Sequence, residues 1–387
     1  MARKPSAKME GEQLNRQMAT TPLRAQHEAA GAVLETYFGC ILPDRFTDFA
    51  SEYRLARDAV AVLDTNYHAI ATLEGPDRVR YLNAVLTNNI QGLASGQGCI
   101  SLLLNPQGHI LAEIECYALY DRLIAISHEI VRERTLSTLD RFIIMDDVTL
   151  ADITADTGTI AIEGPKARYA IQQLCGVSLE DMPDFGVTDC EVATAARTIP
   201  CRMIRRSHFG AIGAEFLISL NSIAEVWETA VEASRALGGG PIGYAALNAL
   251  RLQAGIAWFR HDFDDSVIPH EAALEGTHIS YSKGCYTGQE IVERVRSRGH
   301  VNRRRVGLEF SSRTAPAHGA ILTAEGKEVG WVTSAAYSPA LARVIGMGYL
   351  RREHNSPGSA VDCLGAAATV VSMPFEAQRV PTVSGGS

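Results

Sequence analysis

The sequence predicts an α+β fold of two related modules followed by a small C-terminal β-barrel. A strand, the tripeptide Glu-Gly-Pro and a helix follow one another at residues 70–86 and again at residues 159–175, which indicates a duplicated unit. From Val306 onward, short β-rich runs alternate with Gly, Pro and Asn. That texture is typical of a small all-β barrel.

Size and charge limit the function classes. The 387 residues suffice for two or three domains, and 46% hydrophobic content can form substantial cores. A formal net charge of −8 gives no global attraction to nucleic acid or to an anionic membrane. No window approaches the roughly 18 apolar residues that span a bilayer. We therefore expect a cytoplasmic protein that binds small molecules or proteins, with a polar tail over residues 1–20 instead of a targeting peptide.

The first module combines helices with a β-hairpin. Two apolar runs flank Asn105-Pro106-Gln107-Gly108, where proline and glycine favour a tight turn. Apolar periodicity predicts the other elements. In order, we expect helices at 24–34 and 49–62, a strand at 70–73, a helix at 77–86, strands at 99–104, 110–119 and 123–127, and a helix at 129–142.

The second module begins near residues 145–155 and repeats the strand–helix pattern. Ser222 and Glu225 have the spacing of a capping box that opens a helix ending near Gly238. In order, we expect a strand at 159–162, a helix at 166–175, strands at 202–206 and 215–220, helices from 222 and at 244–254, barrel strands at 306–310, 329–334, 345–350 and 368–372 within a barrel domain at 301–375, and a tail at 376–387.

Cys285 stands apart from the other cysteines. The eight cysteines are scattered without a Cys-x-x-Cys pair, which disfavours a structural metal site and indicates a reducing compartment. Cys285 follows a glycine, which gives little steric cover, and Lys283 can favour the reactive thiolate. Cys285 is therefore a candidate nucleophile, redox thiol or soft-metal ligand. A packed cysteine in a glycine-bearing turn explains the same pattern.

An acidic group at His261, Asp262, Asp264 and Asp265 lies upstream of this cysteine. Divalent cations prefer such oxygen ligands, but the spacing matches no known calcium loop. We therefore expect no bound metal and read the segment as a solvated loop at the rim of a cavity.

The segment Lys283-Gly284-Cys285-Tyr286-Thr287-Gly288-Gln289-Glu290 resembles the signature of the YgfZ-type branch of the folate-binding, glycine-cleavage T-protein-like family. Similarity to the T-protein pattern extends over roughly residues 20–375 and includes Leu103-Leu104-Asn105 and Gly213-Ala214-Glu215. The resemblance implies two intertwined α+β modules over 21–300 and a C-terminal barrel around a central folate cavity. It also implies a tetrahydrofolate-binding accessory protein that supports assembly or repair of iron–sulfur clusters, with iron–sulfur enzymes or cluster-assembly proteins as partners.

The resemblance also assigns site residues. Around Cys285, the residues implied to position or tune the thiol are Lys283, Tyr286, Gln289 and Glu290. A carboxylate can accept the adjacent N–H donors of a pterin, and a guanidinium suits the anionic benzoyl-glutamate end. These roles fall to Glu215 and Arg251, with Asn105 of the hairpin in the folate set. A solvent-facing strand glutamate and a surface helix arginine are the plainer readings.

A basic run follows the cysteine segment. Arg294, Arg296, Arg298 and His300 alternate along the chain, which would place them on one face of an extended segment. They could receive a folate polyglutamate tail, an acidic protein or RNA phosphates. A solvated strand edge protected by charge is the plainer reading.

Two departures from the T-protein pattern weigh against a true aminomethyltransferase. The family has an Asp-Asp pair after the hairpin turn, and one carboxylate assists attack of the folate nitrogen on the aminomethyl group. This chain has Ala112-Glu113 there, which moves the carboxylate by about a methylene, and Gln253 replaces a family glutamate. Aminomethyl transfer is therefore the alternative hypothesis, and a folate-sensing or RNA-contacting module is a third.

Overall fold

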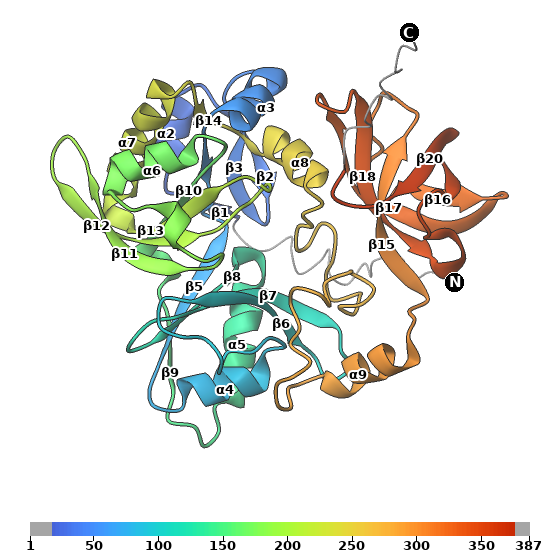
Figure 1. The fold of residues 1–387 in the computed structure, drawn as a ribbon, viewed down its shortest axis with the longest axis horizontal. Coiled ribbons are helices and arrows are strands. Elements are labelled where there is room, and N and C mark those ends of the chain that lie inside the picture. The colour runs from blue at the N-terminus through green and yellow to red at the C-terminus, as the bar shows by residue number, and fades with distance from the viewer. Residues whose placement is uncertain (1–17, 376–387) are drawn as a thin grey trace, which may run out of the picture.

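The computed structural model describes residues 18–375, so the tails expected at 1–20 and 376–387 lie almost entirely outside the described residues. Three groups of elements stand around a common centre, which the loop over residues 255–288 crosses (Figure 1). Two groups are α+β modules and the third is a closed six-stranded barrel. The expected fold class is confirmed, whereas a folate cavity at the centre stays a prediction.

The first module is a five-stranded antiparallel sheet in the order β6-β7-β8-β5-β9. The expected hairpin joins β6 to β7, and the Asn105 side chain accepts the backbone N–H of His109 at 2.9 Å. The elements are β5 (His68–Glu74), α4 (Arg78–Val85), β6 (Gly98–Leu104), β7 (Ile110–Ala118), β8 (Leu123–His128), a 3-10 turn at Glu129–Val131, α5 (Arg132–Phe142) and β9 (Thr149–Asp152).

The second module is a six-stranded sheet in the order β11-β12-β13-β10-β4-β14. Its strand β4 precedes the whole first module in the chain, yet it pairs with β10, Asp64 lying opposite Ile160. The two modules are therefore interlocked. The elements are β4 (Ala61–Asp64), β10 (Thr157–Glu163), α6 (Ala167–Cys175), β11 (Val187–Ala193), β12 (Thr198–Arg205), β13 (Gly213–Ser219), α7 (Ile223–Ala236) and β14 (Gly240–Pro241), with 3-10 turns at Thr154–Asp156, Leu179–Asp181 and Leu220–Ser222.

The N-terminal segment corrects two expected helices. The helix expected to reach residue 34 ends at Ala29, because Gly31 adopts φ +74 and the strand Val33–Tyr37, which contains β-branched side chains, follows. The helix expected to reach residue 62 ends at Asp58, before β4. The elements are β1 (Ala19–Thr20), α2 (Arg24–Ala29), β2 (Val33–Tyr37), β3 (Cys40–Arg45) and α3 (Phe49–Asp58), and the three strands form a sheet in the order β1-β3-β2.

The capping box expected at the start of α7 is wrong. Ser222 makes no side-chain capping bond, and its hydroxyl accepts from Arg197 instead. The Glu225 carboxylate accepts from Arg197 and from Thr194. Tertiary contacts with the β11–β12 turn have therefore replaced the local cap.

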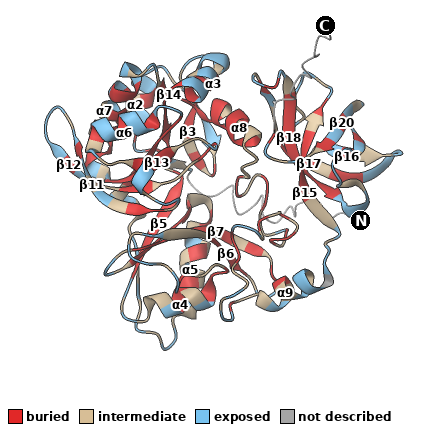
Figure 2. Ribbon diagram, in the orientation of Figure 1, coloured by how far each residue is buried: buried red, intermediate tan, exposed pale blue. Residues whose placement is uncertain are grey.

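The barrel closes in the order β15-β18-β17-β16-β19-β20. Helix α8 (Tyr244–Gln253) packs between α3 and the barrel strands, and Figure 2 shows it largely buried. The barrel strands are β15 (Arg303–Phe310), β16 (Ile321–Ala324), β17 (Lys327–Ser338), β18 (Arg343–Arg351), β19 (Ala360–Cys363) and β20 (Ala366–Val371), with a 3-10 turn at Arg352–His354.

The basic run does not form an extended segment. It lies mostly on α9 (Gln289–Arg298), where residues two apart point in different directions. The expected single face of alternating arginines is therefore wrong. Within residues 18–375, no helix is both long and apolar enough to cross a bilayer, and the cytoplasmic location stays a prediction.

Candidate functional site

Buried carboxylates and histidines gather where the sheets of the two modules meet. The first sheet contributes His68, Glu113, Glu115 and His128, the second contributes Glu215, and the loops contribute Arg206, His208 and His278. Aromatic contacts connect the group: the Tyr67 ring lies 4.3 Å from the His68 ring and 5.2 Å from the His128 ring. Charged side chains are rarely buried without partners, so each contact within this group is informative.

Glu113 is held by two histidines. Its Oε1 lies 3.0 Å from Nε2 of His278, and its Oε2 lies 3.6 Å from Nε2 of His128. Burial opposes ionisation of this carboxyl, but the hydrogen bonds from His128 and His278 outweigh it and hold the pKa of Glu113 below its usual value. Burial lowers the pKa of His128. Glu113 is therefore a carboxylate beside a neutral His128 at neutral pH.

Glu215 has a similar setting in the second sheet and is 1% exposed. Its Oε1 lies 2.8 Å from Nδ1 of His68 and accepts the Thr65 hydroxyl at 2.8 Å, and its Oε2 lies 3.4 Å from Nε2 of His208. Burial opposes ionisation, but the charge of His68 and bonds from both histidines hold the pKa of Glu215 well below normal. Burial likewise opposes charge on His68, yet Glu215 raises its pKa. The pair is ionic.

Glu115 completes the acidic set. Nε of Arg206 donates to its Oε1 at 2.5 Å, and the Tyr117 hydroxyl donates to its Oε2. The Arg206 guanidinium also lies 5.4 Å over the ring of Phe185. A cavity of about 390 Å³ is lined by this arginine and by Asp184, Phe185, Arg205 and residues 210–213. Its volume falls within the usual range for small-molecule sites.

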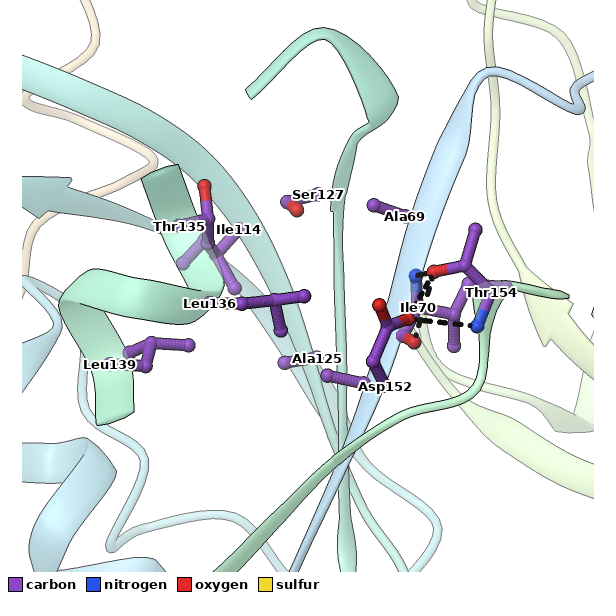
Figure 3. A pocket seen from close by; sticks show the side chains of 11 residues that line it. Ala69, Ile70, Ile114, Ala125, Ser127, Thr135, Leu136, Leu139, Asp152 and Thr154 are labelled. Atoms are coloured by element: carbon purple, nitrogen blue, oxygen red, sulfur yellow. Dashed lines mark hydrogen bonds between the residues drawn. The ribbon is translucent and has the colours of Figure 1, made fainter. Parts of the chain in front are cut away.

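A second hollow is too small for a ligand. It lies between α5 and the first sheet, and its lining includes Leu136, Leu139 and Ile114 (Figure 3). Its volume of about 10 Å³ is near the minimum that can hold one water molecule. The hydroxyl of Thr135 is buried there without a hydrogen-bond partner.

The cysteine segment lies apart from the buried group, against the hairpin turn. Cys285 is exposed. The ammonium of Lys283 donates to the carbonyls of Asn83, Leu86 and Asn88 at the end of α4, so its three donors are engaged away from the thiol. The thiolate-favouring role expected of Lys283 stays a prediction.

The other residues of this segment have structural contacts. Tyr286 is buried with its hydroxyl unpartnered. Gln289 and Glu290 form the first turn of α9, and Gly288 approaches Asn105, because a Cβ there would meet the Asn105 carbonyl at 2.7 Å. The structure thus brings Asn105 to the cysteine segment, and a functional role for these residues stays a prediction.

Arg251 is fully buried, contrary to the surface reading. Its guanidinium pairs with Asp262 and also donates to the Asn248 side chain and to the Ile256 carbonyl. It also lies 4.4 Å over the Trp258 ring. The expected folate-tail contact stays a prediction, but its nitrogens already hold α8 to the following loop.

Two other expectations concern residues near Arg251. The side-chain oxygen of Gln253 accepts from the hydroxyls of Tyr53 and Ser338. The residue that replaces the family's glutamate therefore connects α8 to α3 and to the barrel. Of the acidic group, Asp262 pairs with Arg251, and Asp265 pairs with Arg134. Across the part of the chain that the structure describes, no group of His, Cys, Asp and Glu is arranged to hold a metal ion.

Sequence reasoning missed the four histidines of the buried group: His68, His128, His208 and His278. One signal was available, since Glu113, Glu115 and Tyr117 alternate along β7 and so give one face of an apolar strand a polar row. The histidines that meet this row come from distant segments. Their pairing depends on the tertiary fold.

Comparisons with known proteins cover nearly the whole chain. A family model described as the GCVT N-terminal domain matches residues 23–281, and one described as the glycine cleavage T-protein C-terminal barrel domain matches residues 303–376. An aminomethyltransferase of Halothermothrix orenii is 26% identical, covering 92% of this chain and 100% of that protein. One of Saccharopolyspora erythraea is 29% identical, covering 92% and 97%.

A solved structure agrees in fold. The glycine cleavage system aminomethyltransferase T from Bartonella henselae matches with a TM-score of 0.84 at 24% identity, covering 94% of this chain and 99% of that one. The end-to-end similarity to proteins named aminomethyltransferase contradicts the iron–sulfur maintenance function expected from the cysteine segment. It favours the alternative, and the YgfZ-type assignment receives no support from these relatives.

Proposed function

The chain belongs to the glycine cleavage T-protein family, and from this premise we propose that it is a folate-dependent aminomethyltransferase. The near end-to-end similarity to aminomethyltransferases carries the proposal. Its substrates would be tetrahydrofolate and an aminomethyl group on a carrier protein. Glu113 stands at the place of the family's Asp-Asp pair. It supplies the carboxylate that assists attack of the folate nitrogen on the aminomethyl group.

The buried group has donors and acceptors that suit a reduced pterin. Glu113 and Glu215 are ionised acceptors for N–H groups. Nδ1 of His128 is buried without a hydrogen-bond partner, which leaves an acceptor or donor free for a ligand. When bound, tetrahydrofolate supplies the nitrogen that takes up the one-carbon unit. In this proposal Glu215 orients the pterin and Glu113 moves the proton.

Glu113 suits proton transfer because of its two histidines. A general base must be ionised and must lie within hydrogen-bond reach of the proton that it accepts. The contact with His278 fixes the carboxylate direction, and the pKa lowered by both histidines keeps it ionised. The extra methylene relative to aspartate is compatible with these partners, since both histidines meet the carboxylate at the end of the longer side chain.

The proposal is tested by incubating the protein with tetrahydrofolate and an aminomethylated carrier protein and measuring ammonia and methylenetetrahydrofolate. We expect turnover by the wild type and a loss of about 100-fold or more in Glu113→Gln, which keeps the shape but removes the base. Glu191→Gln makes the same chemical change on an exposed strand position and is expected to be active. A wild-type protein that binds folate but forms neither product would refute the proposal.

A further inference from the structure

We propose that Glu113, His278 and Thr277 form a proton-transfer chain between the buried site and solvent. This inference rests on the proposed function and adds to it a route by which the buried carboxylate exchanges protons. The three side chains follow one another without a gap. They are called the relay below.

The contacts of the relay are short. Oε1 of Glu113 lies 3.0 Å from Nε2 of His278, and Nδ1 of the same ring lies 2.7 Å from Oγ1 of Thr277. Both distances lie within normal hydrogen-bond range. Both ring nitrogens of His278 therefore have a hydrogen-bond partner: Nε2 contacts Glu113 and Nδ1 contacts Thr277.

The first two side chains of the relay are largely buried and the third is exposed. The Glu113 side chain is 13% exposed and that of His278 is 8% exposed, whereas Thr277 is exposed. The Thr277 hydroxyl can also donate toward the Leu274 carbonyl, 3.5 Å away. The relay thus begins at a carboxylate with little access to water and ends at a hydroxyl in contact with solvent.

The main chain fixes His278 in this position. The hydroxyl of Thr87 donates to the His278 carbonyl at 2.7 Å, and the Ser280 N–H donates to the Thr87 carbonyl at 3.1 Å. Thr87 is fully buried. The imidazole is therefore held by the core of the first module although it belongs to the long loop over residues 255–288.

The chemistry of the relay balances without a co-reactant. At rest in this proposal, Nε2–H of His278 donates to the Glu113 carboxylate, and the Thr277 hydroxyl donates to Nδ1. In an inward pass, Thr277 gives its proton to Nδ1 and receives one from water, while Nε2 gives its proton to Glu113. An outward pass reverses each transfer and restores the starting tautomer.

Aminomethyl transfer needs proton movement in both directions along the relay. A departing amine must gain a proton, and an attacking N–H group must lose one. One inward and one outward pass therefore return Glu113 and His278 to their starting state in each turnover.

Other charged groups face the relay and must be considered in any titration. His128 from β8 contacts Glu113, and His68 from β5, Glu115 from β7 and Arg206 from the second module lie around it. The substitution chosen as a test should leave these contacts unchanged. Thr277 meets this condition, because its hydroxyl contacts His278 and Leu274.

The kinetic test compares Thr277→Val with Thr277→Ser. Valine keeps the shape but removes the hydroxyl, and serine keeps the hydroxyl. We expect the valine variant to lose about tenfold in kcat with KM unchanged, a modest share of what acid–base catalysis contributes, and imidazole buffer to restore part of it. The serine variant should retain wild-type kcat. Equal kcat in wild type and the valine variant would overturn the relay.

A second measurement does not depend on turnover. Nitrogen-15 NMR of the ligand-free protein should show His278 with its proton on Nε2, and exchange of that proton with water should be at least about tenfold slower in Thr277→Val. Unchanged exchange, or a proton resident on Nδ1, would overturn the relay even in an active protein. Slower exchange in a protein without transferase activity would keep the relay and refute the proposed function.

Discussion

The guanidinium of Arg251 forms a buried ion pair with the carboxylate of Asp262, and both side chains are at most 1% exposed. The pair joins α8 to the loop that follows it. The other oxygen of Asp262 accepts the hydroxyl of Thr333 on β17 at 2.6 Å. One carboxylate thus connects the α+β region to the barrel.

Removing one partner of this pair should strongly destabilise the protein. Arg251→Met leaves the Asp262 charge buried without its partner, and we expect a loss of about 3–5 kcal/mol in the free energy of unfolding. Urea denaturation measures it. Arg24→Met breaks an exposed pair with Glu28, whose side chains are 51% and 53% exposed, and should cost at most about 0.5 kcal/mol. Equal losses would contradict the role given to Arg251.

Acid should destabilise the protein through its buried carboxylates. Burial opposes ionisation of Asp262, but Arg251 and hydrogen bonds lower its pKa to about 2. Because the unfolded state then binds more protons, stability present above about pH 4 is lost as the pH falls toward 2. Glu215 contributes in the same direction. The free energy of unfolding, measured between pH 7 and pH 3, should decrease with decreasing pH.

A double variant isolates the share of Asp262 in this acid effect. Arg251→Met combined with Asp262→Leu removes the titrating group together with its partner. The decrease in stability between pH 4 and pH 3 should then be shallower than in the wild type. Parallel curves for the two proteins would assign the acid effect to other carboxylates.

Restoring the family's aspartate should not restore a better enzyme. Glu113→Asp withdraws the carboxylate by about one methylene from His278, which lies 3.0 Å away, and from His128. We expect kcat to fall by about 100-fold, because misplacement near 1 Å has an effect of that order. Single-turnover formation of methylenetetrahydrofolate measures it. An aspartate variant as fast as the wild type would show that the histidines do not set the carboxylate position.

Gly288 should not tolerate a side chain. Its φ is +83, and a Cβ would meet the Asn105 carbonyl at 2.7 Å, so Gly288→Ala should cost about 1–3 kcal/mol in the free energy of unfolding. Gly284→Ala is the matched control, since a Cβ there has nothing within 4 Å, and it should be nearly neutral. Thermal or urea unfolding distinguishes them. An alanine tolerated at both positions would mean that α9 does not depend on its contact with the hairpin turn.

Much of the fold could be predicted where local sequence and tertiary packing agree. The hairpin around Asn105 has turn residues between apolar strands, and the structure forms it. The helix expected to reach residue 34 fails because helical periodicity there continues into Val33, where strand pairing with β3 prevails. The extended segment expected for the basic run is wrong for a similar reason, since polar residues two apart in the sequence also occur in an exposed helix such as α9.

The site was less predictable than the fold. Glu113 could be placed beside the hairpin turn from the sequence, and the structure places it on β7. Its partner His278 lies 165 residues away in the chain, and no local pattern connects the two. The cysteine segment had a clear local pattern, but its lysine proved to cap α4. Local patterns predict turns and helices well, whereas partners across the fold depend on the three-dimensional structure.

The pairing of β4 with β10 has a consequence for how the chain can be synthesised and divided. Residues 61–64 leave the ribosome nearly a hundred residues before their neighbours at 160–163, so the second sheet cannot close until the entire first module has been made. A protease cut in the exposed loop at Ile144 and Met145 would therefore leave two fragments that remain associated. Neither fragment would contain a complete sheet of the second module by itself.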